Sequence, residues 1–300
     1  MEDSLDVPKI DVAVVVGEPT EPDPEHSRAR KRRLATRRLR VKEWDPAWWK
    51  PDPETTSLWL DGADADTLHQ VATSVIQWDD KSPNGYHARQ PMASQQPDVT
   101  DGGVFFDARN DRSRLESDWT GSEGVGYTIF FVPKLASLPV DPHQGGGRKL
   151  MSVWNNRSND EMVGGNCYLE AKPGGVAQIQ FFYFVDQTPT TGTIYSGYLE
   201  VGKPAVLSFS TAVDAYQNGF LLGTRVQMSA RTDKLSLGGM WRPGGWADFD
   251  GTIAEFIVYD GLLGSEERQR VEGYLAWKWG TQESLPVSHP YKLQRPLVTA

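Results

Sequence analysis

The chain closes with a strand, a turn and one short helix, and this closing segment constrains the fold more than any other part of the sequence. Along residues 252–259 we expect one face to carry Ala254, Phe256 and Val258, and the other face to carry Ile253, Glu255, Ile257 and Tyr259. Apolar side chains on both faces are typical of a strand that is buried on both sides. The pattern therefore predicts a strand in the interior of a sheet.

A helix is predicted directly after this strand. Asp260-Gly261 and Gly264 end the strand, and Ser265 is in position to cap a helix with Glu266 and Glu267 in its first turn, where acidic side chains complement the helix dipole. The apolar positions that recur at helical spacing are Val271, Tyr274, Leu275 and Trp279, and Gly280 supplies a left-handed stop. One helix in a chain rich in strand and turn signals is expected to pack against a sheet.

Length and composition favour one large all-β domain with an appendage. The chain has 300 residues, with 29 Gly, 20 Pro and 11 Trp, which suits many turns between strands. Its formal net charge of −9 argues against nucleic-acid binding by the main body. Cys167 is the single cysteine, so the chain has no internal disulfide and no thiolate zinc site, and we expect a small buried residue there.

Short strand-like runs fill the middle of the chain. They lie at residues 58–60, 75–78, 104–107, 128–132, 150–154, 178–185, 206–209 and 235–238. Asn218-Gly219, between residues 213–216 and 220–222, is the strongest hairpin signal. Such runs, with turns at irregular intervals, favour an all-β, two-sheet sandwich with Greek-key connections.

Residues 58–90 and 251–291 together resemble the paired signature segments of concanavalin A-like, laminin-G-like jelly-roll domains. The matching positions are Trp59, Asp61, Trp78, Asp79, Lys81, Ser82, Asn84, Gly85, Phe106, Asp107, Asp111, Gly251, Ile253, Ala254, Glu255, Tyr259, Tyr274, Leu275, Lys278, Trp279, Gly280, His289, Pro290 and Tyr291. Most of these positions are interpreted as architectural. The resemblance implies a curved two-sheet jelly roll whose members often bind saccharides on the concave sheet or at the loop rim, some with calcium. Copies of this subtype are similar to domains of phage virion proteins and large bacterial surface proteins.

The sequence divides into an extended N-terminal arm (1–55), the jelly-roll domain (56–292) and a C-terminal tail (293–300). The arm holds an isolated apolar run with Ile10, Val12 and Val14, which we expect to pair with the sheet edge of a partner. A basic run follows at residues 29–42 and includes Arg32, Arg33, Arg37 and Arg38. A solvated flexible arm and docking on an acidic partner protein are both open interpretations of this run. Contact with packaged nucleic acid or with a membrane surface is a less favoured alternative.

Catalysis is not expected. A retaining glycosidase needs two carboxylates on one strand face, and the nearest imitation, Asp248-Phe249-Asp250, is followed by Gly251, which favours a loop. Glu255 stands alone in its strand and is expected to pair with an arginine. The five histidines lie in no nucleophile motif, and His87 and His289 are interpreted as loop residues with structural hydrogen bonds.

Two binding sites are predicted in loops. Aromatic platforms with polar rims suit saccharides, and the candidate residues are Trp241, Arg242, Trp246, Asn155 and Asn156. Calcium is the one cofactor that the sequence leaves open, with Asp107, Asp111 and Asp250 as candidate ligands. For these aspartates we favour turn capping over calcium binding.

These observations lead to a non-enzymatic phage virion structural protein, a head decoration, fibre or tail component attached by its arm. Its expected partners are other virion proteins and host surface polysaccharide, with no membrane span, and a homo-oligomer is left open. The sequence shows no targeting segment, so we expect synthesis in the host cytoplasm and a place in the virion. The alternatives are a bacterial carbohydrate-binding surface protein and a glycan hydrolase or lyase.

Overall fold

The computed structural model describes residues 47–107, 113–120, 126–139, 150–157, 164–184, 194–211, 214–224, 234–239 and 249–298, and gives the backbone alone at 150–157, 164–166, 182–184 and 194–196. Contacts divide the chain into Met1–Thr36 and Arg37–Ala300, and every described residue belongs to the second unit. The arm residues Ile10, Val12, Val14, Arg32, Arg33, Arg37 and Arg38 lie outside the described residues.

The described residues are mostly β-strand. The strands are β1 (Leu58–Asp61), β2 (Leu68–Val71), β3 (Ser74–Trp78), β4 (Ala88–Arg89), β5 (Asp98–Thr100), β6 (Gly103–Phe106), β7 (Leu115–Ser117), β8 (Tyr127–Leu135), β9 (Leu150–Arg157), β10 (Gly164–Lys172), β11 (Val176–Phe184), β12 (Ile194–Glu200), β13 (Leu207–Ser210), β14 (Asp214–Gln217), β15 (Phe220–Thr224), β16 (Lys234–Leu237) and β17 (Gly251–Asp260). Helix α2 spans Ser265–Trp279, and short 3₁₀ turns lie at Pro53–Thr55, Ala65–Thr67, Ala93–Gln95 and Gln282–Ser284.

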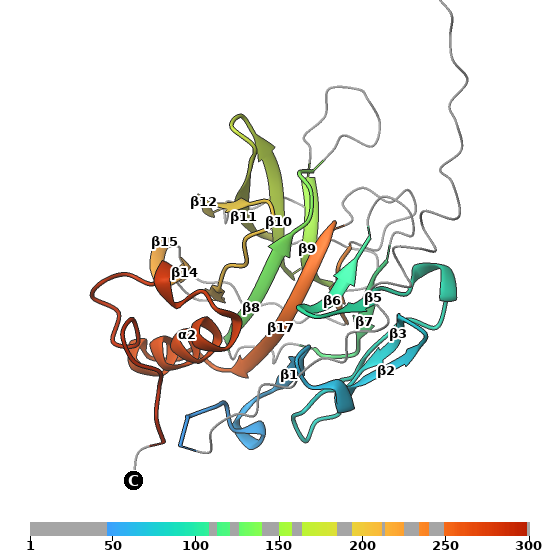
Figure 1. Ribbon diagram of the computed structural model, residues 1–300, viewed down its shortest axis with the longest axis horizontal. Helices are drawn as coiled ribbons and strands as arrows, with labels where there is room; N and C mark the ends of the chain where they lie inside the picture. Colours follow the sequence, from blue (N-terminus) through green and yellow to red (C-terminus); the bar gives the residue numbers. More distant parts are fainter. Residues whose placement is uncertain are drawn as a thin grey trace, which may run out of the picture. The chain divides into compact units, whose positions relative to one another are not determined.

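The first sheet is built around β17 (Figure 1). On one edge β17 pairs with β1 and β6, and on the other with β8. The sheet continues from β8 to β13, β14 and β15. All of these pairings are antiparallel, so β17 is the interior strand that the sequence predicted.

The second sheet runs from β2 through β3, β4, β7, β16, β9, β10 and β11 to β12, again antiparallel. The β5–β6 hairpin joins the two sheets, since β5 pairs with β3 and β6 pairs with β17. Phe181 of β11 packs against Phe131 of β8 and stacks on Phe209 of β13 at 5.0 Å. The two sheets therefore face each other across one apolar core, which confirms the predicted jelly-roll sandwich.

A β-bulge in β17 changes which side chains face the core. The pairing of β17 with β8 shifts between Ile253 and Phe256. Ile253 consequently joins the core between the sheets, and Ala254 packs with the helix. The expected alternation was wrong at these two positions, because a bulge inserts an extra residue and swaps the faces before it. Beyond the bulge, Phe256 and Val258 face the core as expected.

Helix α2 covers the outer face of the first sheet. Val271, Tyr274 and Leu275 pack against Trp59, Phe130, Ile257 and Tyr259 in a second apolar cluster, so the predicted helical face is confirmed. The helix is capped by Gly264 and begins at Ser265, one residue earlier than expected, so Ser265 is its first residue and not its cap. Gly280 ends it with a φ of 72°, in the left-handed region.

Two further sequence predictions are confirmed. Asn218-Gly219 forms the two-residue turn between β14 and β15, with φ of 49° and 77°, as a type I′ hairpin requires. Cys167 is fully buried in β10, and burial raises the pKa of its thiol well above the ordinary value.

Residues 47–49 pair with residues 296–298, an arrangement we call the terminal pairing. Trp49 N donates to Pro296 O, and Val298 N donates to Ala47 O, both at 3.0 Å. The Arg295 guanidinium lies 3.1 Å from the centre of the Trp48 ring, and Trp49 packs edge-on against Tyr274 of α2. Residues 47–49, near the end of the predicted arm, are therefore fixed to the domain beside its last described residues. No helix among the described residues has the length and apolar character needed to cross a membrane.

Candidate functional site

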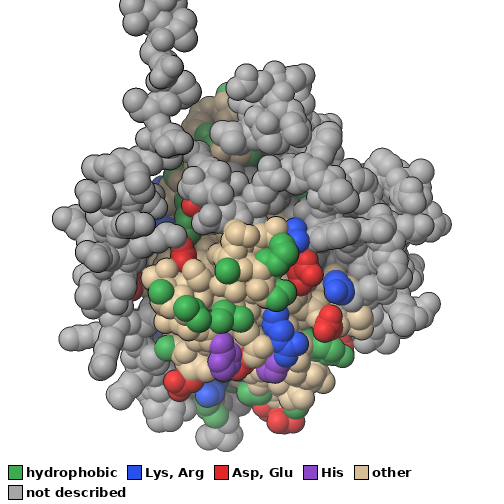
Figure 2. Space-filling view, turned by 90° about the vertical axis from the view of Figure 1, so that its right-hand side faces the viewer, with side chains coloured by type: hydrophobic (Ala, Val, Ile, Leu, Met, Phe, Trp, Pro, Cys, Tyr) green, Lys and Arg blue, Asp and Glu red, His purple; other side chains and the backbone are tan. Residues whose placement is uncertain are grey.

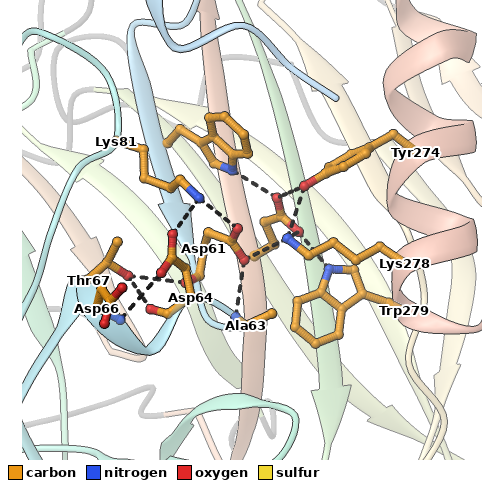
Figure 3. Close-up of polar contacts among 11 residues, drawn as sticks. Asp61, Ala63, Asp64, Asp66, Thr67, Lys81, Tyr274, Lys278 and Trp279 are labelled. Carbon is orange, nitrogen blue, oxygen red and sulfur yellow. Dashed lines mark hydrogen bonds and ion pairs between the residues drawn. The ribbon is translucent and has the colours of Figure 1, made fainter. Parts of the chain in front are cut away.

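Two lysines and three carboxylates meet under helix α2, in an arrangement we call the ion cluster (Figure 3). Lys278 of α2 lies 2.6 Å from Asp61 Oδ1 and 2.8 Å from Glu255 Oε2. Lys81, in the loop after β3, lies 3.1 Å from Asp61 Oδ2 and 2.7 Å from Asp64 Oδ2. Asp61 and Glu255 are direct partners in the β1–β17 register, so strand pairing brings the two acids together.

The carboxylate of Glu255 accepts hydrogen bonds from side chains of both β1 and α2. The donors are Trp59 Nε1 at 2.8 Å, Tyr274 OH at 3.0 Å and Trp279 Nε1 at 2.7 Å, in addition to Lys278. The side chain of Glu255 is fully buried. The expected arginine partner was wrong: a lysine and two indoles hold this carboxylate, and α2 supplies Lys278, Tyr274 and Trp279.

The pKa values of the two central acids of the ion cluster are shifted in opposite directions. Burial raises the pKa of Glu255 above its ordinary value, although Lys278 acts against this shift. Burial would also raise the pKa of Asp61, but Lys278 and Lys81 outweigh it and hold that pKa below 3.8. Lys81 in turn has a pKa above its ordinary value, because Asp61 and Asp64 outweigh the effect of burial.

The geometry of the ion cluster fits a structural role better than a catalytic one. General acid or base catalysis needs a group within hydrogen-bond reach of a substrate, whereas Asp61 is 5% exposed and Glu255 is 0% exposed. The acceptors of Glu255 already meet four donors. We infer that these residues fix α2 on the first sheet.

The loop after β3 is held together by one carboxylate, that of Asp80, which accepts several hydrogen bonds. Asp80 accepts from the backbone of Trp59 at 2.8 Å, from Ser82 at 2.9 Å and from Tyr86 at 3.0 Å. His87 Nδ1 accepts from Asp80 N at 3.1 Å. The architectural interpretation of this motif, and of His87 as a structural hydrogen-bonding residue, is confirmed.

Most of the predicted binding residues lie outside what the structure describes. For the saccharide candidates, Trp241, Arg242 and Trp246 are outside the described residues, and Asn155 and Asn156 are described by backbone alone, as β9 positions paired with β16. Their role in binding stays a prediction.

Two of the three calcium candidates, Asp107 and Asp250, are described, and they flank the paired residues Phe106 and Gly251 of β6 and β17. Asp250 is buried and accepts from the hydroxyl of Ser137, and the backbone N–H of Asp107 donates to Ser113 Oγ at 2.6 Å. Asp111 lies outside the described residues. Among the residues that are described, no group of three or more His, Cys, Asp and Glu side chains could hold a metal.

The face over β2 and β3, on the right in Figure 1, exposes a few apolar side chains. Figure 2 shows it with hydrophobic side chains dispersed on a largely uncharged surface, and with basic, acidic and histidine side chains around them. The exposed apolar residues in this part of the chain are Val71, Ile76 and Met92. Dispersed apolar residues are normal on a protein surface, so we assign no role to this face.

A polar hollow lies on the outer face of the first sheet, beside the first turn of α2. It holds about 380 Å³ of space, part of it open to solvent. Its lining residues are Thr128 of β8, Ser208, Phe209 and Ser210 of β13, Asp214 and Tyr216 of β14, Leu263, and Ser265 and Arg268 of α2. Sequence reasoning missed this hollow, because its residues come from segments up to 140 positions apart and form no local motif.

Arg268 forms one wall of the hollow. Its guanidinium lies 3.6 Å from the centre of the Tyr216 ring, and its Nη1 donates to both oxygens of Glu272, at 2.7 and 2.8 Å. Glu272 is fully buried and also accepts from Ser208 Oγ at 2.8 Å. His289 Nε2 lies 3.4 Å from Glu272, which confirms His289 as a structural hydrogen-bonding residue.

The sequence matches no protein-family model and none of the curated proteins. Among solved structures, the chain is similar to a Trypanosoma rangeli sialidase in complex with 2,3-difluorosialic acid, with a TM-score of 0.51 and 13% identity over 85% of this chain and 38% of that one. It is also similar to a SAP-like pentraxin from Limulus polyphemus, with a TM-score of 0.44 and 13% identity over 57% of this chain and 80% of the pentraxin.

A third similar structure is the binding domain of botulinum neurotoxin serotype G, with a TM-score of 0.49 and 13% identity over 76% of this chain and 52% of that one. The chain thus spans about half of the neurotoxin chain and less than half of the sialidase. At this identity the likeness to the sialidase concerns the fold alone, and it agrees with the jelly-roll sandwich described above.

The ion cluster generates a stability prediction. In Lys278→Met, Asp61 and Glu255 lose their shared cation, and we expect a loss of about 3–5 kcal/mol in the free energy of unfolding, because a buried charge is left uncompensated. In Glu255→Gln, Lys278 keeps Asp61, and we expect a smaller loss of about 1–3 kcal/mol. Chemical denaturation of the purified variants measures both.

Lys203→Met is the matched control for this prediction, because the Lys203–Glu200 pair is exposed, with 70% and 55% of the two side chains accessible. Exposed pairs contribute little, so this variant should unfold like the unmodified protein. A Lys278→Met variant as stable as Lys203→Met would show that the ion cluster does not hold α2 in place.

Proposed function

We propose that this chain is a non-enzymatic, glycan-binding display module of a bacteriophage virion. A jelly-roll domain carries the binding surface in this proposal, and the N-terminal arm attaches it to the particle. The observation that carries the proposal is the terminal pairing. It fixes residues 47–49 to residues 296–298 and to α2, so the arm starts from a rigid point of the domain.

A rigid starting point suits an arm that anchors a domain to a partner. Arg295 lies over the ring of Trp48, and Tyr274 of α2 packs against Trp49. These contacts connect the end of the arm to α2. The basic run with Arg32, Arg33, Arg37 and Arg38 precedes this point directly and is suited to an acidic surface of a virion protein. The resemblance of residues 58–90 and 251–291 to phage copies of the domain supports the same assignment.

The non-enzymatic part of the proposal is supported by the state of the carboxylates. Asp61 and Glu255, the acids that strand pairing brings together, are buried and bound to Lys278. Asp250 is likewise buried and bound to Ser137. Among the residues described, these acids are committed to holding the fold.

Glycan binding without turnover is the first expected result. The purified protein should be retained on immobilised bacterial surface polysaccharide, and no new reducing ends should appear on long incubation. Trp241→Ala together with Trp246→Ala tests the predicted platform, and Asp118→Ala, an exposed aspartate in another part of the chain, is the control. Turnover that Asp250→Asn or Glu255→Gln abolishes in a folded protein would favour the hydrolase or lyase alternative.

Attachment through the arm is the second expected result. Charge reversal at Arg32, Arg33, Arg37 and Arg38 should remove the protein from assembled particles while the domain keeps its unfolding temperature. The contact should also weaken with salt, since charges are screened over about 8 Å at physiological ionic strength. Reversal at the exposed residues Arg89, Lys134, Lys203 and Lys234, which lie outside the arm, is the control. Electron cryomicroscopy of whole particles that shows no copy of the domain would favour the bacterial surface protein.

A further inference from the structure

The hollow beside α2 has the features of a small-ligand site. Its cavity volume, without the open solvent around it, is about 90 Å³, which is below the range for drug-sized ligands and leaves room only for a small ligand that stays partly exposed. It lies on the outer face of the first sheet, since Ser208 and Ser210 alternate with Leu207 and Phe209, which face the core. None of its lining residues belongs to the sets predicted to bind saccharide or calcium.

The walls of the hollow are held in place by buried groups. Thr128 and Ser208 are 2% and 1% exposed. Arg268 is fixed between the ring of Tyr216 and the buried carboxylate of Glu272. Tyr216 OH donates to Asp214 Oδ2 at 3.0 Å. A site whose walls are already ordered loses little freedom when a ligand binds.

One polar atom at this site lacks a partner. Asp214 Oδ1 is buried, and no described residue donates a hydrogen bond to it. A buried acceptor without a donor is costly, so Asp214 favours a ligand that brings a hydroxyl. Ser265 adds an exposed hydroxyl group that can donate and accept, whereas the hydroxyl of Thr128 donates to Gly261 O at 3.0 Å and accepts from Leu263 N at 3.1 Å.

The charges of the hollow select against an acidic ligand. Arg268 is balanced by Glu272, and Asp214 adds a further negative charge. Leu263 supplies apolar contact, which suits the C–H face of a pyranose ring. A hollow lined by polar groups beside an apolar side chain, with no excess positive charge, complements a neutral sugar better than an acidic one.

We propose that this hollow binds one neutral, hydroxyl-bearing sugar residue of a glycan, with Asp214 accepting a sugar hydroxyl and Leu263 contacting the ring. This assignment rests on the proposed glycan-binding function and adds a site and a ligand class to it. Trp241 and Trp246 are not among the residues that line the hollow, so the two predicted contacts can be tested one at a time.

The test uses the full chain and ligand-observed NMR. The probes are the methyl glycosides of glucose, galactose, mannose and N-acetylglucosamine, with methyl glucuronide as the acidic counterpart, at millimolar concentrations. Two variants alter the hollow: Asp214→Ala removes the acceptor, and Ser265→Trp fills the space from an exposed position. Asp118→Ala, exposed and outside the hollow, is the matched control, and thermal unfolding verifies that each variant is folded.

We expect at least one neutral glycoside to bind the unmodified protein and Asp118→Ala alike, and to bind both hollow variants about tenfold more weakly or not at all. Equal binding to all variants would overturn the inference while leaving glycan binding by another surface intact. Stronger binding of the glucuronide than of any neutral glycoside would overturn the assigned ligand class. Absence of any binding would overturn the site, and the polysaccharide retention assay then decides separately whether the proposed function survives.

Discussion

The bridge from Lys278 to Asp61 and Glu255 is the interaction on which the rest of this structure depends. The two acids belong to neighbouring strands, and the lysine comes from a helix that follows the second strand. Removing ions from water is costly, and a buried pair recovers that cost only with good geometry and further hydrogen bonds. Here the further bonds come from two indoles and a phenol. The bridge therefore specifies one position of α2 on the sheet.

The position of α2 in turn decides which part of the sheet stays open. A second buried acid, Glu272, binds Arg268, Ser208 and His289, so the helix is fixed at its first half as well as at its end. The hollow lies beside the first turn of α2 and is lined by residues of β8, β13 and β14. The terminal pairing places residues 47–49 beside residues 296–298, and Trp49 packs against the same helix. The ion cluster, the proposed attachment and the proposed sugar site thus all involve α2.

The sequence predicted the parts of the fold that local physics decides. The Asn-Gly hairpin, the apolar face of α2 and the left-handed stop at Gly280 follow from turn chemistry and periodicity. Long strands such as β10 and β12 were not among the predicted runs, because their polar residues and glycines hide the pattern. The alternation of β17 was wrong at Ile253 and Ala254, because a bulge depends on the partner strand.

The candidate sites were harder to predict for the same reason. Glu255 looked solitary in the sequence, since Asp61 and Lys278 lie about 190 residues before it and 23 residues after it. The hollow joins residues of three strands and a helix, and no spacing in the sequence indicates it. The sequence did carry one signal for the ion cluster, because Asp61, Lys81, Glu255 and Lys278 all match the family resemblance. These positions were interpreted as architectural, but their contacts with one another were not predicted.

Native-state hydrogen exchange tests the central claim, that the ion cluster joins α2 to the first sheet, most directly. If the claim holds, the backbone amides of Leu275 and Ala276 should exchange with the same opening free energy as those of Phe256 and Ile257 in β17, because helix and sheet open together. In Lys278→Met the helix amides alone should lose protection first. Helix amides that exchange well before those of β17 in the unmodified protein would contradict the account.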